Sequence, residues 1–167
     1  SELKMLMVTR KSPWYDWLPW VSSLKFDPVV LKADLVRLTA WYKDLGYYEV
    51  VIDTMVDRSY VDKVYLGLRI KEGKVVRVSS FSLEGMSGIS ELDSLDVLNG
   101  LQIIQGSPHV RAKIKEDQSL IVRKFQNRGF AFAEVSVKVG VIPELYSSEI
   151  IYRISAGPRC KFGNIQI

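Results

Sequence analysis

The feature that most constrains the fold is a helix, a stop and a strand that occur in the same order twice. The first copy covers residues 41–53 and the second covers residues 125–137. In each copy an apolar helical stripe ends at a glycine, Gly46 or Gly129. Glycine ends helices readily because the left-handed conformation is open to a residue without a Cβ. The aromatic and β-branched residues that follow suit a half-buried strand, so the motif predicts two copies of one small α+β unit.

The sequence on either side of this motif also repeats. Gly157 follows Gly73 at the interval that separates Gly129 from Gly46, to within one position, and apolar residues recur after both glycines. Asp27-Pro28 and Ser107-Pro108 each offer a capping oxygen before a proline that lacks an orphan N–H. We therefore expect long helices over residues 28–45 and 108–128. The residues that recur after the glycines are Val76, Val78, Phe81 and Leu83 in one copy and Cys160, Phe162, Ile165 and Ile167 in the other.

The spacing of apolar residues predicts which face of each long helix is buried. Charged residues between the apolar positions, including Asp34, are expected off the buried face. A short helix is also expected between the first strand of the second copy and its long helix, capped by Ser90 and carrying Leu92, Leu95 and Leu98. The inward stripes of the long helices are Leu31, Leu35, Leu38, Tyr42 and Leu45 in the first and Val110, Ile114, Ile121 and Phe125 in the second.

Alternating apolar residues after each long helix predict two strands in each copy. A change of phase between Val78 and Phe81 predicts a bulge in a further strand over residues 75–84. In the first strand of the first copy, Ile52, Thr54 and Val56 are expected on one face and Asp53, Met55 and Asp57 on the other. The residues expected inward are Val64, Leu66, Leu68 and Ile70 in the first copy, and Val135, Val137, Val139, Ile150, Tyr152 and Ile154 in the second.

These elements predict an α+β fold of tandem β-α-α-β-β domains. Two antiparallel helices and a hairpin leave the first and third strands parallel, so the third strand is expected at the centre of a small mixed three-stranded sheet with both helices on one face. We assign residues 1–74 to a first, N-terminally incomplete domain and residues 75–158 to a second. Residues 159–167 are expected to be the first strand of a following, truncated domain, so we expect the chain to be part of a longer protein.

The N-terminal segment before Val21 contains two stretches that the repeat does not explain. Residues 3–9 fit either the end of a short helix, with Leu3, Leu6 and Met7 inward, or a true first strand. Three evenly spaced tryptophans follow, in a stretch interrupted by Pro19. These possible docking aromatics could anchor a partner protein, cover the incomplete first domain as a hydrophobic plug, or contact a membrane interface. They are Trp14, Trp17 and Trp20.

Composition narrows the classes of function. A net charge of +4 is spread over the whole chain, which argues against a nucleic-acid-binding half. The second long helix is the most basic feature and is either a solvated face or a docking surface for acidic protein or lipid headgroups. No apolar run approaches the ~20 residues that span a bilayer, and we expect targeting and membrane segments to lie outside this chain. The basic residues are Arg111, Lys113, Lys115, Arg123, Lys124 and Arg128.

No constellation of residues predicts catalysis or a bound cofactor. His109 is the sole histidine and is expected at the surface near the start of a helix, without a paired nucleophile or acid. Cys160, the sole cysteine, matches Val76 in the repeat and is expected to be a small apolar strand residue. Metal ligation is not expected from one His and one Cys, and no Walker or dinucleotide-binding loop is present. We predict a protein that is not an enzyme and has no cofactor.

The predicted sheet leaves its second strand as an exposed edge. An edge strand can accept an extended peptide through main-chain hydrogen bonds, whatever the sequence of the peptide. The candidate peptide-binding positions, which could equally be solvated strand faces, are Val51, Asp53 and Met55 in the first copy and Glu134, Ser136 and Lys138 in the second.

The repeated unit resembles the POTRA (polypeptide-transport-associated) domains that precede the β-barrel of outer-membrane assembly factors of the BamA and TamA type. The matching residues are Phe26-Asp27-Pro28, the helical segment 34–38, the helix end 42–48, and in the second copy residues 125–130 and 156–158. The resemblance covers residues 24–83 and 107–167, whereas residues 10–23 depart from it. Arg128 also stands where the first copy has Leu45.

The resemblance implies a periplasmic scaffold of an outer-membrane protein. Its expected partners are unfolded outer-membrane proteins or accessory periplasmic proteins, and its own C-terminal β-barrel would lie outside this fragment and provide the membrane association. The alternative is a KH-like tandem module that binds nucleic acid, because KH domains share a β-α-α-β arrangement. KH domains clamp phosphates with a Gly-x-x-Gly loop, and the loop over residues 101–106 contains none.

Overall fold

The computed structural model describes residues 7, 26–57, 64–86 and 96–160. The chain divides into two compact units, one formed by Ser1–Lys43 and Tyr47–Gly73 and the other by Asp44–Gly46 and Lys74–Ile167. Several predictions concern residues outside the described part of the chain. These are the docking tryptophans Trp14, Trp17 and Trp20, the conformation of residues 3–9 apart from Met7, the short-helix positions Ser90, Leu92 and Leu95, and the strand over 161–167.

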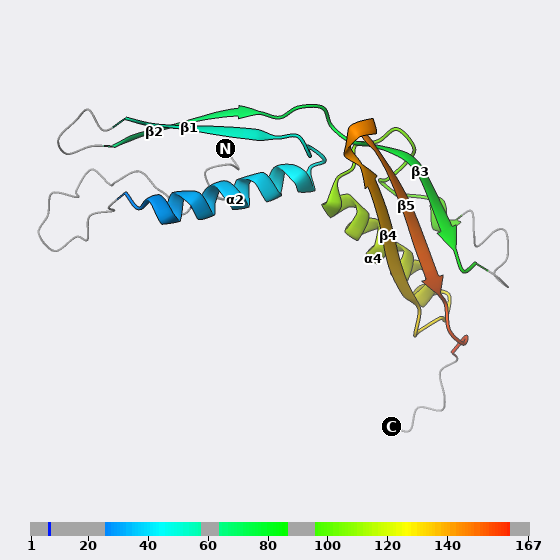
Figure 1. Ribbon diagram of the computed structural model, residues 1–167. Helices are drawn as coiled ribbons and strands as arrows, with labels where there is room; N and C mark the ends of the chain where they lie inside the picture. The colour runs from blue at the N-terminus through cyan, green and yellow to red at the C-terminus, as the bar shows by residue number, and fades with distance from the viewer. Residues whose placement is uncertain (1–6, 8–25, 58–63, 87–95, 161–167) are drawn as a thin grey trace, which may run out of the picture. The chain divides into compact units, whose positions relative to one another are not determined.

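The first unit contains one described helix and one β-hairpin pair (Figure 1). Helix α2 spans Pro28–Asp44, and strands β1 (Val51–Asp57) and β2 (Tyr65–Lys71) pair antiparallel. The predicted cap is confirmed, because Asp27 Oδ1 accepts the backbone N–H of Val29 at 2.7 Å. In β2 the predicted inward residues Leu66, Leu68 and Ile70 are half-buried, and Arg69 and Lys71 are exposed as predicted, whereas Val64, before the strand, is exposed.

Of the three β1 residues expected to share one face, two are exposed. Ile52 is half-buried, but Thr54 and Val56 are exposed. Their exposure has a simple cause among the described residues. The two-stranded sheet gives β1 a single neighbour, so the end of the strand that is far from Gly46 has little to pack against.

The second unit contains a three-stranded sheet with the strand order β3-β5-β4. Strand β5 (Ser147–Ser155) is central, parallel to β3 (Arg77–Glu84) and antiparallel to β4 (Glu134–Ile142). The predicted central position of the third strand is therefore confirmed. The predicted bulge is confirmed as well, because the β3–β5 register shifts between Val78 and Ser80. A short 3-10 helix, η1 (Pro143–Leu145), joins β4 to β5.

Helix α4 (Arg111–Asn127) covers one face of this sheet (Figure 1). Its buried apolar residues Ile114, Ile121 and Phe125 were all predicted from the helical spacing. Val139 was predicted inward but is 42% exposed, because β4 is the outer strand and has no neighbour on that flank among the described residues. The core also contains Val78, Val97, Ile103, Ala133, Val135, Ile150, Tyr152 and Ile154.

The predicted cap of the second long helix is wrong. Helix α4 begins at Arg111, and Val110 precedes it without a side-chain capping bond. Residues 107–109 instead form backbone bonds with β3 and the residue before it: the N–H of Val78 donates to Ser107 O at 2.9 Å, and the N–H of His109 donates to Val76 O at 2.9 Å. This extended pairing is incompatible with a helical start at Pro108, so the helix starts later than the sequence suggested.

Two aspartates in the long helices are buried, and one of them was predicted off the buried face. Asp34 in α2 and Asp117 in α4 are each 1% exposed, and the interval between them in the sequence equals that between Gly46 and Gly129. The carboxylate of Asp117 accepts the backbone N–H of Gln102 at 2.9 Å, and Asp34 accepts a bond from Arg37 at 2.6 Å. Hydrogen bonds to a carboxylate compensate its loss of hydration, which is why an acid can occupy these positions.

Candidate peptide-binding edge strands

The helix stop that precedes each candidate strand has the same geometry in both copies. Gly46 and Gly129 have φ angles of 94° and 91°, a conformation that favours glycine. After each of them the chain folds back onto the helix end: the N–H of Tyr47 donates to Tyr42 O at 2.9 Å, and the N–H of Phe130 donates to Phe125 O at 3.1 Å. The rings of these pairs also meet edge to face, with centroids 6.1 and 5.9 Å apart.

A second backbone bond recurs at the carbonyl of each glycine. The N–H of Val76 donates to Gly46 O at 2.9 Å, and the N–H of Cys160 donates to Gly129 O at 2.7 Å. Val76 and Cys160 are the residues that the repeat matched in sequence, so the match extends to hydrogen bonding. Together these contacts fix where β1 and β4 begin relative to the helix before them.

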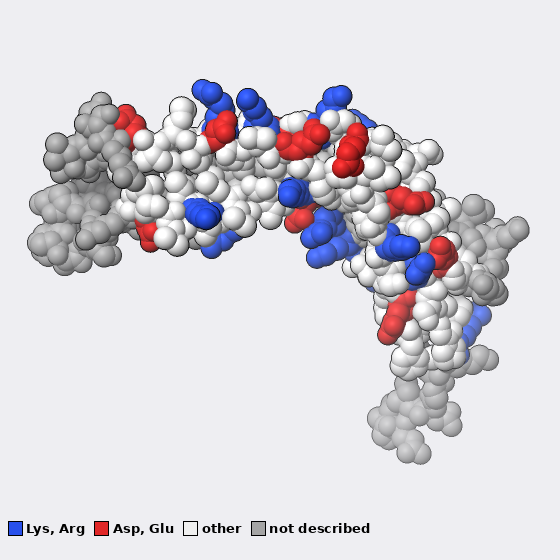
Figure 2. Space-filling view, viewed as in Figure 1, with Lys and Arg blue, Asp and Glu red and all other residues white. Residues whose placement is uncertain are grey.

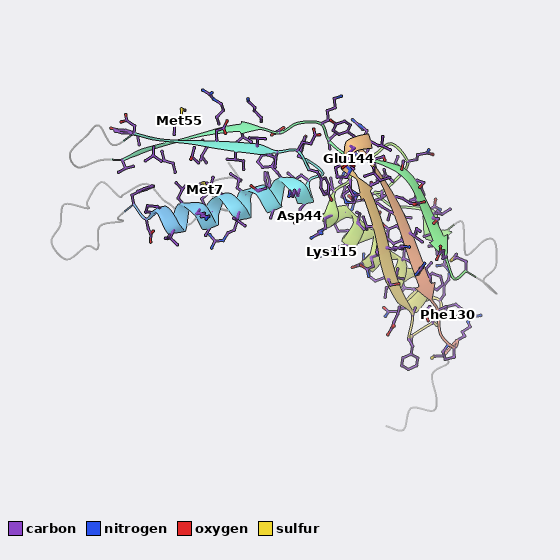
Figure 3. All side chains as sticks on the ribbon, in the orientation of Figure 1. Met7, Asp44, Met55, Lys115, Phe130 and Glu144 are labelled. Atoms are coloured by element: carbon purple, nitrogen blue, oxygen red, sulfur yellow. The ribbon has the colours of Figure 1, made fainter. Side chains whose placement is uncertain are left out.

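The six candidate positions lie on β1 and β4, and all are exposed. Val51 and Met55 are 51% and 55% exposed, and Figure 3 shows the Met55 side chain on the side of the β1–β2 pair away from α2. In the described part of the chain β1 pairs only with β2, and β4 pairs only with β5. Both strands therefore have one flank without a strand neighbour there.

The contacts between β5 and β3 show which backbone N–H and C=O groups of β4 point toward β5 and which point away from it. Tyr146 O accepts the N–H of Arg77, Ser148 O accepts the hydroxyl of Ser79, and a Cβ built on Gly85 would lie 2.0 Å from Ile154 O. The even-numbered residues of β5 thus direct their backbone groups toward β3. Because backbone groups alternate in direction along a strand, the odd-numbered residues of β5 bond to β4.

This alternation divides β4 into two sets of residues. Glu134, Ser136 and Lys138 lie opposite Ser155, Arg153 and Ile151, so their backbone groups bond to β5 while their side chains remain exposed. The free flank is formed by the backbone groups of the residues between them. These are Val135, Val137, Val139 and Val141.

Helix α4 contacts this flank at one point. The side-chain amide of Gln118 donates to Val135 O at 2.6 Å, and Gln118 is half-buried. A side chain from α4 can reach this carbonyl because it is directed away from β5. Sequence analysis did not single out Gln118, since a glutamine on a helix flank carries no signal until the strand beside it is known.

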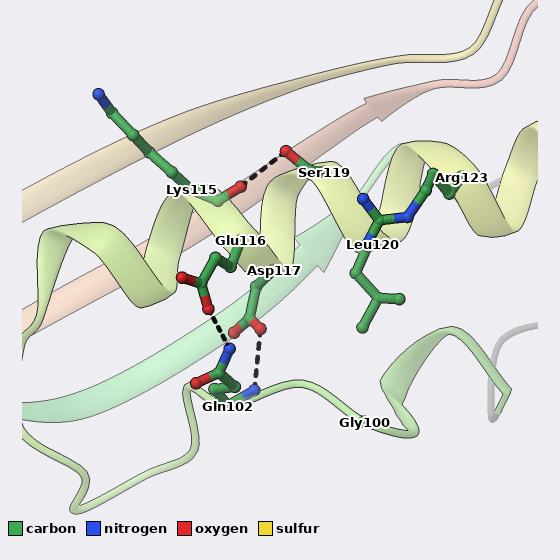
Figure 4. A pocket seen from close by; sticks show the side chains of 8 residues that line it. All are labelled: Gly100, Gln102, Lys115, Glu116, Asp117, Ser119, Leu120 and Arg123. Carbon is green, nitrogen blue, oxygen red and sulfur yellow. Dashed lines mark hydrogen bonds between the residues drawn. The ribbon is translucent and has the colours of Figure 1, made fainter.

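The surface of α4 has two open grooves. In the first groove the Gln102 amide donates to Glu116 at 2.5 Å and the Gln102 N–H donates to Asp117, so its polar groups bond one another (Figure 4). Lys115 and Arg123 contribute to both grooves. The first groove is lined by Gly100, Gln102, Lys115, Glu116, Asp117, Ser119, Leu120 and Arg123, and the second by Lys115, Gln118, Ser119, Val122 and Arg123.

Charges of both signs are interspersed on the face shown in Figure 2, without a large area of one sign. Two of the basic residues predicted for this helix bond to the segment before it. Arg128, just after the end of α4, pairs with Asp96, and Lys124 donates to the carbonyls of Asp96 and Asn99. The hydrogen bond from Arg128 lowers the pKa of Asp96 below its ordinary value. Only part of the basic helix face is therefore available for docking.

The prediction that His109 lies at the surface is wrong. His109 is 3% exposed, and its Nδ1 lies 3.0 Å from the hydroxyl of Ser148, which is also buried. Burial lowers the pKa of His109, and the charge of Arg111 lowers it further. A buried His–Ser pair offers no access to a substrate. The described residues also contain no group of three or more His, Cys, Asp or Glu side chains that could hold a metal ion.

The second unit is a small α+β module. Its outer strand β4 has no strand neighbour on one flank among the described residues, and the long helix α4 lies beside that flank. Residues 76–157 match the model of the POTRA family, described as the surface antigen variable number repeat. The expected resemblance is thus confirmed for the second unit. No curated protein sequence matches the chain.

A solved structure of BamA POTRA domains shares the fold of this chain. The crystal structure of Haemophilus influenzae BamA POTRA3–5 has a TM-score of 0.51 at 20% identity, covering 95% of this chain and 61% of that one. Haemophilus influenzae BamA POTRA4 has a TM-score of 0.41 at 20% identity, covering 52% and 97% of the two chains. This chain thus spans about three-fifths of the POTRA3–5 structure. In the described part of the chain no helix is both long and apolar enough to cross a membrane.

Proposed function

We propose that the chain is a periplasmic scaffold of an outer-membrane protein assembly or translocation factor. The observation that carries this proposal is the free flank of β4 within the residues that match the POTRA family. Its partners would be unfolded outer-membrane proteins or accessory periplasmic proteins, and a C-terminal β-barrel outside this sequence would hold the scaffold at the membrane. The scaffold would act by binding alone, without catalysis or a cofactor.

The free flank suits a client that is extended and variable in sequence. Hydrogen bonds from main-chain groups need no particular client side chain. Three of the valines that form the flank are also partly accessible on the α4 side, since Val137 and Val141 are half-buried and Val139 is 42% exposed. A client strand with alternating apolar residues would therefore gain backbone bonds on β4 and some apolar contact beside α4. The candidate side chains Glu134, Ser136 and Lys138 would then border the added strand on the open face of the sheet.

The first unit would bind in the same way through β1. Val51, Asp53 and Met55 are the repeat counterparts of the three β4 positions, and β1 has one strand neighbour among the described residues. The docking tryptophans Trp14, Trp17 and Trp20 remain a prediction for a second kind of contact, with an accessory protein. The POTRA match of residues 76–157 favours protein binding over the KH-like alternative.

The test is a titration of the isotope-labelled chain with an extended peptide of alternating hydrophobicity. We expect amide shifts over residues 48–56 or 134–142, and shifts restricted to α2 and α4 would contradict edge binding. Val139→Pro removes one outward N–H without removing a bond to β5, so it should weaken binding to the second unit about tenfold or more. Val139→Ala keeps that N–H and is the matched control. A short RNA in place of the peptide should produce no shift.

A further inference from the structure

One end of the free flank of β4 is already occupied. Val135 is the first outward-facing residue of the strand, and its carbonyl accepts the Gln118 amide at 2.6 Å. The remaining outward residues, Val137, Val139 and Val141, have no such contact from α4 among the hydrogen bonds of the described residues. Edges of sheets are commonly protected by covering part of the strand.

The first unit lacks this contact. By the interval that separates Gly46 from Gly129, Leu35 in α2 is the counterpart of Gln118 in α4, and Ile52 is the counterpart of Val135. A leucine side chain has no hydrogen-bond donor. The two units therefore differ at the position where a client strand would begin to pair, although their helix stops and strands correspond.

We propose that Gln118 sets the register of a client strand on the second unit. The client would pair with Val137, Val139 and Val141 and stop before Val135, because the Gln118 side chain occupies the space that the next client residue needs. A client strand could pair with β4 in more than one register, because the outward positions of β4 are equivalent valines. The bond between Gln118 and Val135 O would exclude the registers in which the client pairs with Val135. This inference rests on the proposed function, and it identifies a positioning residue that edge binding alone does not require.

The half-buried state of Gln118 supports a fixed contact. Its neighbours along the helix, Asp117 and Ile121, are buried, so the first part of its side chain is held beside the sheet. Displacing its amide from Val135 O would leave a donor in a partly dehydrated place, and an unpaired polar group of this kind is unfavourable. The client strand is therefore expected to end at Gln118 and to leave this bond intact.

The experiment uses the whole chain, labelled for NMR, with a saturating extended peptide that carries a spin label at one end. In the unmodified chain, exchange protection on binding should appear at Val137, Val139 and Val141 but not at Val135. Gln118→Leu reproduces the residue of the first unit. In this variant the amide exchange protection should extend to Val135, and the peptide spin label should broaden the NMR signals of residues nearer to Val135. One further backbone bond should make binding about fivefold tighter.

Two further variants complete the test. Gln118→Glu keeps the length of the side chain but removes its donor, so it should behave as Gln118→Leu does. Ser119→Ala is the matched control, because Ser119 is exposed and its hydroxyl bonds to Lys115 O within the helix. Unchanged β3 and β5 amide signals in the unbound variants would establish that the sheet is intact.

The outcomes separate the inference from the proposed function. Identical protection and broadening in the unmodified chain and in both Gln118 variants would overturn the role of Gln118 and leave edge binding standing. Protection of Val135 in the unmodified chain would overturn it equally. An absence of protection at every outward residue of β4, in all variants, would overturn the proposed function for this unit and the inference with it.

Discussion

Asp117 and Ile103 are both buried, and the carboxylate of Asp117 accepts the backbone N–H of Ile103 at 2.8 Å. The other carboxylate oxygen accepts the N–H of Gln102, so one side chain of α4 satisfies two consecutive backbone donors of the loop before the helix. This loop also bonds to β3 through Gly106 and Ser107. The aspartate therefore joins the helix layer to the loop that precedes the helix.

Asp117→Ala should destabilise the second unit by about 2–4 kcal/mol, because one buried and one partly buried N–H group lose a charged acceptor. Urea unfolding followed by NMR signals of β4 and β5 measures the loss in this unit alone. Glu116→Ala is the matched control: Glu116 is exposed, so the change should be within about 0.5 kcal/mol. Equal effects of the two substitutions would contradict the role assigned to Asp117.

Gly129→Ala should lower the stability of the second unit by about 1–2 kcal/mol, since a residue with a Cβ is strained at a φ of 91°. Gly140 in β4 provides the comparison within the same unit. It is exposed, its φ is not positive, and a Cβ added there would meet nothing within 4 Å. Gly140→Ala should therefore leave the thermal midpoint almost unchanged.

The stability of the second unit should fall as the pH drops below about 6.5, the ordinary pKa of histidine. The folded pKa of His109 is lowered, so the unfolded chain takes up a proton that the folded chain does not, and protonation favours unfolding. The slope should stay below about 1.4 kcal/mol per pH unit, which is the limit for the uptake of one proton. His109→Gln should remove this slope between pH 7 and pH 5, in which range carboxylates remain largely ionised. A slope that persists in the variant would assign the effect to another group.

Tyr152→Phe should leave the second unit as stable as before or slightly more stable, by up to about 1 kcal/mol. The Tyr152 hydroxyl is fully buried and has no hydrogen-bond partner among the residues that the structure describes, and its pKa is raised by burial and by the nearby charge of Asp117. Removing an unpaired buried hydroxyl removes its dehydration penalty. A loss of more than about 1 kcal/mol would indicate that the hydroxyl has a partner in solution.

Most of the fold could be predicted because it depends on periodicity and glycine position. The central position of β5, the bulge after Val78 and the buried stripe of α4 all follow from apolar spacing and chain order. The start of α4 could not be predicted in this way. Ser107-Pro108 is a good local cap, but pairing with the segment that begins β3 determines the backbone there, and tertiary hydrogen bonds override local preference.

The errors at Asp34 and His109 have a common physical origin. Both residues are polar and were therefore assigned to the surface, whereas each has a hydrogen-bond partner that lies elsewhere in the structure or on the next helical turn. The equal spacing of Asp34 and Asp117 was a usable signal, because two acids at matching repeat positions indicate a shared structural role. For His109 the sequence contains no comparable signal.

The candidate strands could be identified from sequence, but the groups that form the flank could not. Alternation of side chains indicates which face of β4 is exposed, and it identified Glu134, Ser136 and Lys138 correctly as exposed. Which residues direct their N–H and C=O away from β5 depends on the register of the whole sheet. That register is determined by β3 and its bulge, which precede β4 in the chain and are separated from it by the whole of α4.

The alternation along β4 has a consequence for how such a surface can change over evolutionary time. The residues whose side chains face solvent use their backbone groups to hold the sheet together, and the residues whose backbone groups face outward have side chains directed toward the helix. Substitutions on the exposed face therefore leave the outward main-chain groups where they are. Two related proteins could therefore differ at every exposed side chain of this strand and still offer the same outward main-chain groups for pairing. A comparison of their side chains would not detect this shared main-chain surface.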